Sequence, residues 1–147
     1  MKIAFYIIFA IITLLVMLRI PDGPAKLKYI KLLAWGVPAT LAVAILAMLT
    51  VKVLGIRPDE DFKEIFFGIV LSTLAVLLIN GMLIGADYII DFQLKFHSAH
   101  NAANSSRYPI RFLVKNERLI RIVVRITFFL GSLLMFYGVW LKNKQNL

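Results

Sequence analysis

Four long stretches of the sequence contain no charged residue. They are 16, 20, 22 and 16 residues long and cover residues 3–18, 32–51, 65–86 and 126–141. An α-helix rises about 1.5 Å per residue, so about 20 residues cross the hydrocarbon core of a bilayer. The stretches are apolar on every face, which excludes the alternating pattern of a membrane β-strand. The pattern predicts an all-α, polytopic membrane protein with four transmembrane helices at residues 3–20, 32–52, 64–87 and 122–141.

Composition supports a membrane location. Of the 147 residues, 61% are hydrophobic and 17% are charged, whereas soluble domains typically have about 45–50% apolar and about 25% charged residues. The chain has no cysteine, which excludes disulfides, thiolate metal sites and thiol redox chemistry within it. We expect residues 1–147 to form a single transmembrane domain, because the segments between the stretches are too short for a separate soluble catalytic domain.

The first apolar stretch has a second interpretation, as a cleaved signal peptide. Lys2 precedes the stretch, and residues 23–25 (Gly-Pro-Ala) have the small-x-small form of a cleavage site. The stretch is longer than the usual length of about 7–15 residues, however, and Arg19 and Asp22 interrupt the cleavage region. We therefore expect the first helix to be retained.

Basic residues are distributed unequally between the two sides of the predicted membrane. Eleven lie in segments 19–31 and 87–125, and six lie on the opposite side. Because Lys and Arg favour the cytoplasmic side, both termini are expected outside the cytoplasm. The acidic loop before the third helix is then also outside, and its Asp59 or Asp61 is expected to cap that helix. Short loops and a compact chain suggest a bacterial inner membrane.

A regular series of basic residues precedes the last apolar stretch, at Arg107, Arg111, Lys115, Arg118, Arg121 and Arg125. At about 100° per residue, these positions cover an arc of about 120° on one helical face. Residues 104–106 (Asn-Ser-Ser) supply helix-capping side chains, and Pro109 suits a first turn. The pattern predicts a basic amphipathic helix in a cytoplasmic segment, residues 88–121, that contacts anionic lipid headgroups or a partner.

Two other interpretations of this basic series are weaker. A helix resembling a voltage sensor would hold Arg118, Arg121 and Arg125 inside the membrane, which is energetically costly. Nucleic-acid binding has the same charge signature. The series adjoins a membrane helix, however, and lacks stacking aromatic residues among its charges, so we expect no nucleic-acid partner.

One face of the third predicted helix is polar. Thr73, Asn80 and Asp87 are spaced by seven residues and share a helical face, and Asp91 lies one turn further on. We expect Asp87 and Asp91 to form ion pairs with the arginines that begin the fourth helix (Arg118, Arg121 and Arg125), because both groups lie on the same side of the membrane. The alternative is that an intramembrane carboxylate binds protons or cations during transport.

Small residues form possible helix-packing surfaces. Gly81 and Gly85 make a Gly-x-x-x-Gly pair on the third helix, and Gly36 and Gly131 lie in similar rows on the second and fourth. Glycines at this spacing let two helix backbones approach closely in lipid. The rows are expected to mediate packing within one bundle or, alternatively, contact between copies of the chain.

Candidate groups for chemistry are sparse. His97 and His100 are three residues apart, but the polar stretch 97–106 resembles a loop and offers no matched third ligand, so we expect no metal. Ser105 and Ser106 have no recognisable base partner. There is no phosphate-binding glycine loop and no dinucleotide motif, so no cofactor is expected.

These observations favour a non-enzymatic membrane protein that acts by binding another membrane protein, as an accessory, regulatory or immunity-type subunit. The alternative is a small oligomeric transporter or channel for protons, cations or a small solute that uses Asn80 and Asp87. An intramembrane enzyme acting on lipid is disfavoured, because no acid, base and nucleophile converge in the sequence.

Overall fold

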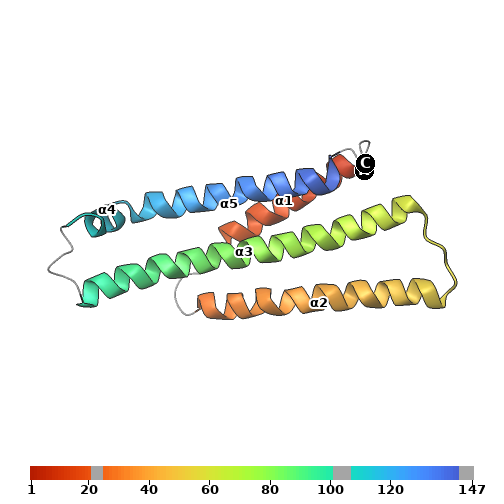
Figure 1. Ribbon diagram of the computed structural model, residues 1–147, viewed down its shortest axis with the longest axis horizontal. Coiled ribbons are helices and arrows are strands. Elements are labelled where there is room, and N and C mark those ends of the chain that lie inside the picture. Colours follow the sequence, from red (N-terminus) through yellow and green to blue (C-terminus); the bar gives the residue numbers. More distant parts are fainter. Residues whose placement is uncertain (21–24, 101–106, 143–147) are drawn as a thin grey trace.

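The computed structural model describes residues 1–20, 25–100 and 107–142 (Figure 1). Within these ranges the chain is helical and has no strand, which confirms the predicted all-α class. The helices are α1 (Lys2–Leu18), α2 (Ala25–Val53), α3 (Glu60–His100), α4 (Ile110–Lys115) and α5 (Glu117–Trp140). Most of the possible cleavage motif and the predicted caps Asn104, Ser105 and Ser106 lie outside the described residues.

Three of these helices, α2, α3 and α5, are long and apolar enough to cross a membrane by length and composition. Helix α1 is also apolar but has 17 residues. Its length of about 26 Å is less than the hydrocarbon thickness of about 30 Å. The described residues therefore contain three candidate membrane spans and one shorter apolar helix.

Two helices extend well beyond the apolar stretches that predicted them. Helix α2 begins at Ala25 and α3 continues to His100, so the loop expected at residues 97–100 is wrong. Extending an existing helix gains one backbone hydrogen bond per residue without a new nucleation step, so the polar ends remain helical. These extensions place Lys26 and Asp91 inside helices. The beginning of α3 agrees with the prediction, because Asp59 Oδ1 accepts a hydrogen bond of 2.7 Å from the Phe62 N–H.

The basic series before the last helix does not form one continuous amphipathic helix. It is divided between α4 and α5 at Asn116, whose φ of −112° and ψ of 17° depart from helical values. The Asn116 side chain donates a hydrogen bond of 2.9 Å to the Phe112 carbonyl. Such side-chain bonding to the backbone competes with regular helix geometry.

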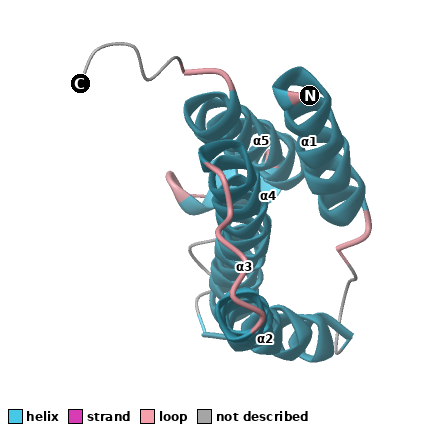
Figure 2. Ribbon diagram, turned by 90° about the vertical axis from the view of Figure 1, so that its right-hand side faces the viewer, coloured by secondary structure: helices cyan, strands magenta, loops and turns pink. Residues whose placement is uncertain are grey.

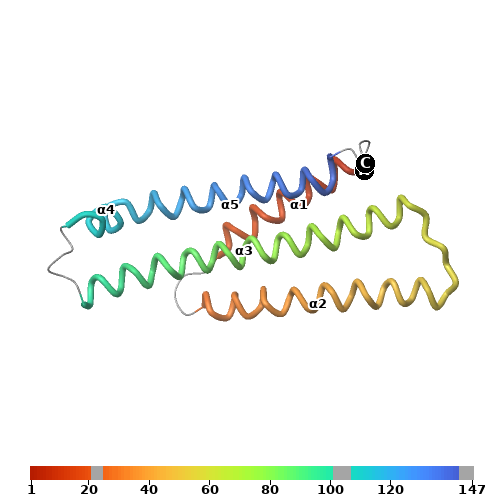
Figure 3. Tube along the Cα trace, in the orientation of Figure 1, coloured from red at the N-terminus to blue at the C-terminus, as the bar shows by residue number. Residues whose placement is uncertain are grey.

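The four long helices do not close into a four-helix bundle. Helix α3 lies at the centre, with α1 and α5 on one side and α2 on the other (Figure 2). Helices α1 and α5 contact each other as well as α3, whereas α2 packs extensively along α3 alone. A hydroxyl–carbonyl contact of 3.5 Å from Tyr29 to Val16 joins the beginning of α2 to α1. The tube in Figure 3 shows α2 and α3 running side by side for most of the length of α2.

The end of α5 is clamped between α1 and α3 by Trp140. Its indole N–H donates a hydrogen bond of 2.8 Å to the Ser72 hydroxyl, and its ring stacks on Phe5 with centroids 4.7 Å apart. A Cβ atom added to Gly68 would lie 2.6 Å from the indole ring. The close approach of α5 to α3 therefore depends on a glycine that the small-residue rows did not include.

The glycines that were predicted to pack helices divide into two groups. Gly36 on α2 behaves as expected, because an added Cβ would lie 2.9 Å from the Leu77 side chain of α3. For Gly81, Gly85 and Gly131 the prediction of packing within the chain is wrong, since an added Cβ would meet nothing within 4 Å. A side chain at any of these three positions would enter open space.

Candidate functional site

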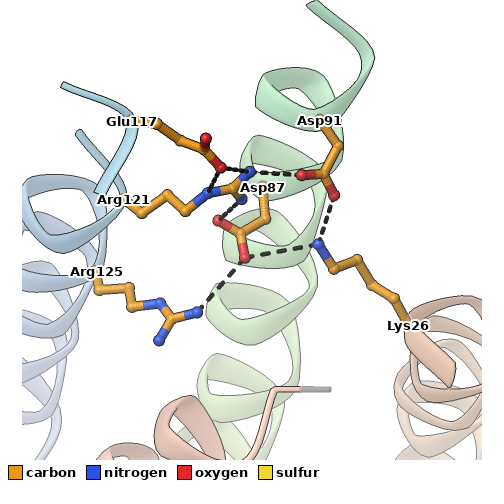
Figure 4. Close-up of polar contacts among 6 residues, drawn as sticks. All are labelled: Lys26, Asp87, Asp91, Glu117, Arg121 and Arg125. Carbon is orange, nitrogen blue, oxygen red and sulfur yellow. Dashed lines mark hydrogen bonds and ion pairs between the residues drawn. The ribbon is translucent and has the colours of Figure 1, made fainter. Parts of the chain in front are cut away.

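The most distinctive polar feature of the structure is a cluster of charged side chains where α2, α3 and α5 meet (Figure 4). Asp87 and Asp91 lie one turn apart on α3, and Arg121 and Arg125 lie one turn apart on α5. Residues four apart share a face of a helix, so each pair points at the other helix. The members of this ion cluster are Lys26, Asp87, Asp91, Glu117, Arg121 and Arg125.

Asp87 is the centre of the ion cluster. Its residue is only 1% exposed, and cations approach it from two other helices. Arg121 Nη1 lies 3.1 Å from Oδ1, whereas Arg125 Nη2 and Lys26 Nζ lie 3.7 and 3.8 Å from Oδ2. One short ion pair and two longer ones therefore surround a buried carboxylate.

Asp91 and Glu117 complete the cluster on its more open side. Lys26 Nζ lies 2.8 Å from Asp91 Oδ2, and Arg121 Nη2 donates to Asp91 Oδ1. Arg121 also binds Glu117 Oε1 through both Nε, at 3.1 Å, and Nη2, at 2.9 Å. A single guanidinium thus contacts three carboxylates, which uses the planar, multiple-donor geometry that Arg has and Lys lacks.

The formal charges of the ion cluster balance. Three cations (Lys26, Arg121 and Arg125) face three carboxylates (Asp87, Asp91 and Glu117), which gives a formal sum of zero. Moving an isolated charge out of water costs several kcal/mol, and partners in good geometry offset that cost. Lys26 and Asp87 are both buried, so the other members of the cluster supply the polar partners that water would supply at the surface.

The ion pairs predicted between the third and fourth apolar helices are confirmed for Arg121 and Arg125. Arg118, which was grouped with them, is exposed and has no ion-pair partner among the described residues. Arg107, Arg111 and Lys115 are also exposed. The division at Asn116 and the inward turn of α5 therefore separate a series that the sequence pattern placed on one face.

Two members of the ion cluster were not predicted from the sequence. Lys26 was counted only as a basic residue of the segment between the first two apolar stretches, because the predicted second helix began six residues after it. Glu117 belongs to the i, i+4 pair Glu117–Arg121, which was a usable sequence signal. The helical extension of α2 is what brings Lys26 to α3.

The polar face predicted on α3 is only partly turned toward the core. Asn80 is fully buried, and its amide group donates a hydrogen bond of 2.8 Å to the Val76 carbonyl. The Asn80 Oδ1 atom is buried without a hydrogen-bond partner among the described residues. Thr73 is half-buried and donates its hydroxyl to the Ile69 carbonyl of its own helix, at 2.8 Å. Asn80 and Asp87 are therefore the core members of this face.

His97 and His100 lie on the last turns of α3 and are not members of the ion cluster. The Phe96 ring contacts both imidazoles, with centroids 5.5 and 5.4 Å apart. Over the described ranges, there is no group of three or more His, Asp or Glu side chains placed to hold a metal ion. Both histidines therefore pack beside an aromatic ring at the end of α3.

Chemically, the ion cluster can either hold three helices together or exchange a proton or cation at Asp87. Comparison with known proteins does not choose between these roles. No protein-family model matches the sequence, and neither a curated protein nor a solved structure is significantly similar to it. The choice therefore depends on the geometry of this chain alone.

Proposed function

We propose that this protein is a membrane-embedded interaction subunit without catalytic activity, which presents helix α2 to another membrane protein. One observation carries the proposal: the ion cluster anchors the Lys26 end of α2, while the rest of α2 packs along α3 alone. In the most apolar window of each helix, 6% of the residues of α2 are buried, compared with 11% for α5 and 44% for α3. A helix that is anchored at one end and otherwise uncovered is available to a partner in the membrane.

The uncovered face of α2 has the spacing of a helix-docking surface. Leu32, Trp35, Ala39, Val43 and Leu46 recur at intervals of three and four residues, and all are exposed. Trp35 is 75% exposed, and large aromatic residues are enriched at the energetic centres of interfaces. We assign these five residues as the outer face of α2.

The balanced charges of the ion cluster support bracing over ion transport. A carrier carboxylate must exchange its proton or cation with water or substrate. Asp87 is buried and already surrounded by Lys26, Arg121 and Arg125. Releasing those partners would leave buried charges without compensation, which costs about 3–5 kcal/mol for a broken buried pair.

The placement in the membrane is part of the proposal. Helix α1 serves as a fourth span, because Lys2 and Arg19 at its two ends can extend their charged groups to the interfaces. The basic residues of the α4 region (Arg107, Arg111 and Lys115) contact anionic headgroups on the cytoplasmic side of a bacterial inner membrane. Both termini are then outside the cytoplasm.

The test is gentle extraction of the tagged chain from its native membrane, followed by native mass measurement of the complex. We expect a second protein at fixed stoichiometry that is lost from the variant Trp35→Ala/Leu46→Ala. The matched control is Leu134→Ala, which truncates an exposed leucine of α5 and should retain the partner. Equal recovery of the partner with both variants would contradict a role of α2, and a pure homo-oligomer would contradict the proposal.

A transporter or channel is the second candidate, and one observation favours it. Asn80 Oδ1 is a buried acceptor without a partner among the described residues, two turns from Asp87 on the same helix. A bound water or ion is one explanation for such an atom. Reconstituted vesicles test this candidate through proton and cation flux. Flux that depends on Asp87 and is abolished by Asp87→Asn would replace the interaction proposal with transport.

A further inference from the structure

A second feature of the structure lies at the opposite end of α2 from the ion cluster. A groove of about 770 Å³ separates the last three turns of α2 from the beginning of α3. Figure 1 shows this end of the molecule at the loop that joins the two helices. The walls of the groove are mainly apolar and include Leu41, Ala44, Ile45, Met48, Phe66 and Val70.

The groove has the depth of one bilayer leaflet. On α2 it extends from Lys52 back to Leu41, a distance of about 16 Å along the helix. Half of the hydrocarbon core is about 15 Å thick. The groove begins at a cationic side chain and then continues for this distance between apolar side chains. Its length and chemistry therefore match one acyl chain below a headgroup.

The charges at the mouth of the groove are all positive. Lys52, Arg57 and Lys63 line it, and no carboxylate does. Lys63 is occupied by an ion pair of 2.7 Å with Glu60. Lys52 and Arg57 are exposed and have no ion-pair partner within the part of the chain that the structure describes. These two cations are therefore available to an anion at the end of the groove.

Three acidic residues near the groove have partners of their own. Asp59 accepts the Phe62 N–H at the beginning of α3, and Glu60 is bound to Lys63. Glu64 is paired with Lys2 of α1 at 2.8 Å. The identified partners of these three carboxylates thus belong to α3 and α1.

We propose that this groove binds one anionic phospholipid, with an acyl chain between α2 and α3 and the phosphate at Lys52 and Arg57. The apolar walls supply the chain-shaped surface, and the two cations distinguish an anionic headgroup from a zwitterionic one. This site is separate from the outer face of α2 and from the basic residues of the α4 region. It does not depend on the interaction function proposed above.

The test is native mass spectrometry of the full chain in nanodiscs that contain phosphatidylglycerol and phosphatidylcholine in equal amounts. We expect one retained phosphatidylglycerol. Each removed cation should weaken its retention about fivefold, so Lys52→Gln/Arg57→Gln should lose it. The matched control is Lys28→Gln/Lys31→Gln, which removes two exposed cations at the other end of α2 and should keep this lipid.

A second pair of variants tests the groove itself. Ala44→Phe fills the groove, and Ala42→Phe adds the same side chain to an exposed position of α2 that does not line it. We expect lipid loss from the first variant only, with unchanged helicity by circular dichroism in both. Equal retention by the two variants would overturn the site. Equal binding of phosphatidylcholine, or retention after loss of both cations, would overturn the anionic specificity.

Discussion

The Arg121 guanidinium lies 3.1 Å from the Asp87 carboxylate and so joins α5 to α3 across 34 residues of sequence. The carboxylate is buried and the guanidinium is largely so. Because α3 also carries Asp91 on the next turn, a shift of α5 along α3 would break two ion pairs of Arg121 together. This relationship sets the register of the two helices, and Lys26 extends it to α2.

Reversing the charges of Asp87 and Arg121 tests the helix brace. Asp87→Arg and Arg121→Asp should each lower the melting temperature in detergent, because each leaves buried charges unpaired, at a cost of about 3–5 kcal/mol. The double variant should recover part of that loss. Equal destabilisation by the single and double variants would show that the two residues act independently. Glu60→Gln, at an exposed ion pair, should leave the melting temperature unchanged.

Replacing Lys26 should free the beginning of α2. In Lys26→Met, Asp91 loses its 2.8 Å partner and Asp87 loses one of three cations. We expect the distance between spin labels on α2 and α3, measured by pulsed electron resonance, to broaden near residue 26. Lys28→Met is the control, because Lys28 is exposed two residues away. A narrow distance distribution in both variants would contradict an anchoring role.

Enlarging Gly68 should disturb the Trp140 clamp. A Cβ there would lie 2.6 Å from the indole ring, and overpacking of this kind typically costs about 1–3 kcal/mol. Gly68→Ala should therefore lower the melting temperature and shift the tryptophan fluorescence toward that of an exposed indole. Gly138→Ala meets nothing within 4 Å and should change neither quantity. A wild-type spectrum for Gly68→Ala would argue against this packing.

Removing the Ser72 hydroxyl should destabilise the same clamp by a different route. Ser72→Ala leaves the buried Trp140 N–H without its 2.8 Å acceptor, and an unsatisfied buried donor costs about 1–3 kcal/mol. The expected result is a lower melting temperature with unchanged helical content. Ser98→Ala, at an exposed serine, is the control. If both variants melted at the wild-type temperature, the hydrogen bond would contribute little to stability.

Several elements of the fold and the site were predictable because they depend on local pattern. Apolar stretches longer than 19 residues located α2 and α3, and seven-residue spacing placed Asn80 and Asp87 on one face. The spacing of four between Arg121 and Arg125 made both available to the same carboxylate. Pairing of Asp87 with these arginines then followed from their position at the same end of adjacent helices.

Other elements were not predictable from local pattern. The small-residue rows predicted close packing at Gly81, Gly85 and Gly131, but these glycines face open space, whereas Gly68 contacts Trp140. A row of glycines shows where a helix could approach, and only the arrangement of the helices decides where one does. The burial of Trp140 at the end of an apolar stretch was also not predictable, because it depends on where α1 and α3 lie.

The sequence by itself determined that this is an all-helical protein with long apolar helices and charges of both signs near their ends. These properties depend on hydrophobicity and spacing along a single chain segment. Only the tertiary structure decided that α2 packs on α3 alone and that Lys26 completes the ion cluster. It also decided that a groove with cations at its mouth lies at the opposite end of α2. Each of these depends on contacts between residues distant in sequence, because in lipid no hydrophobic force by itself selects which helices adjoin.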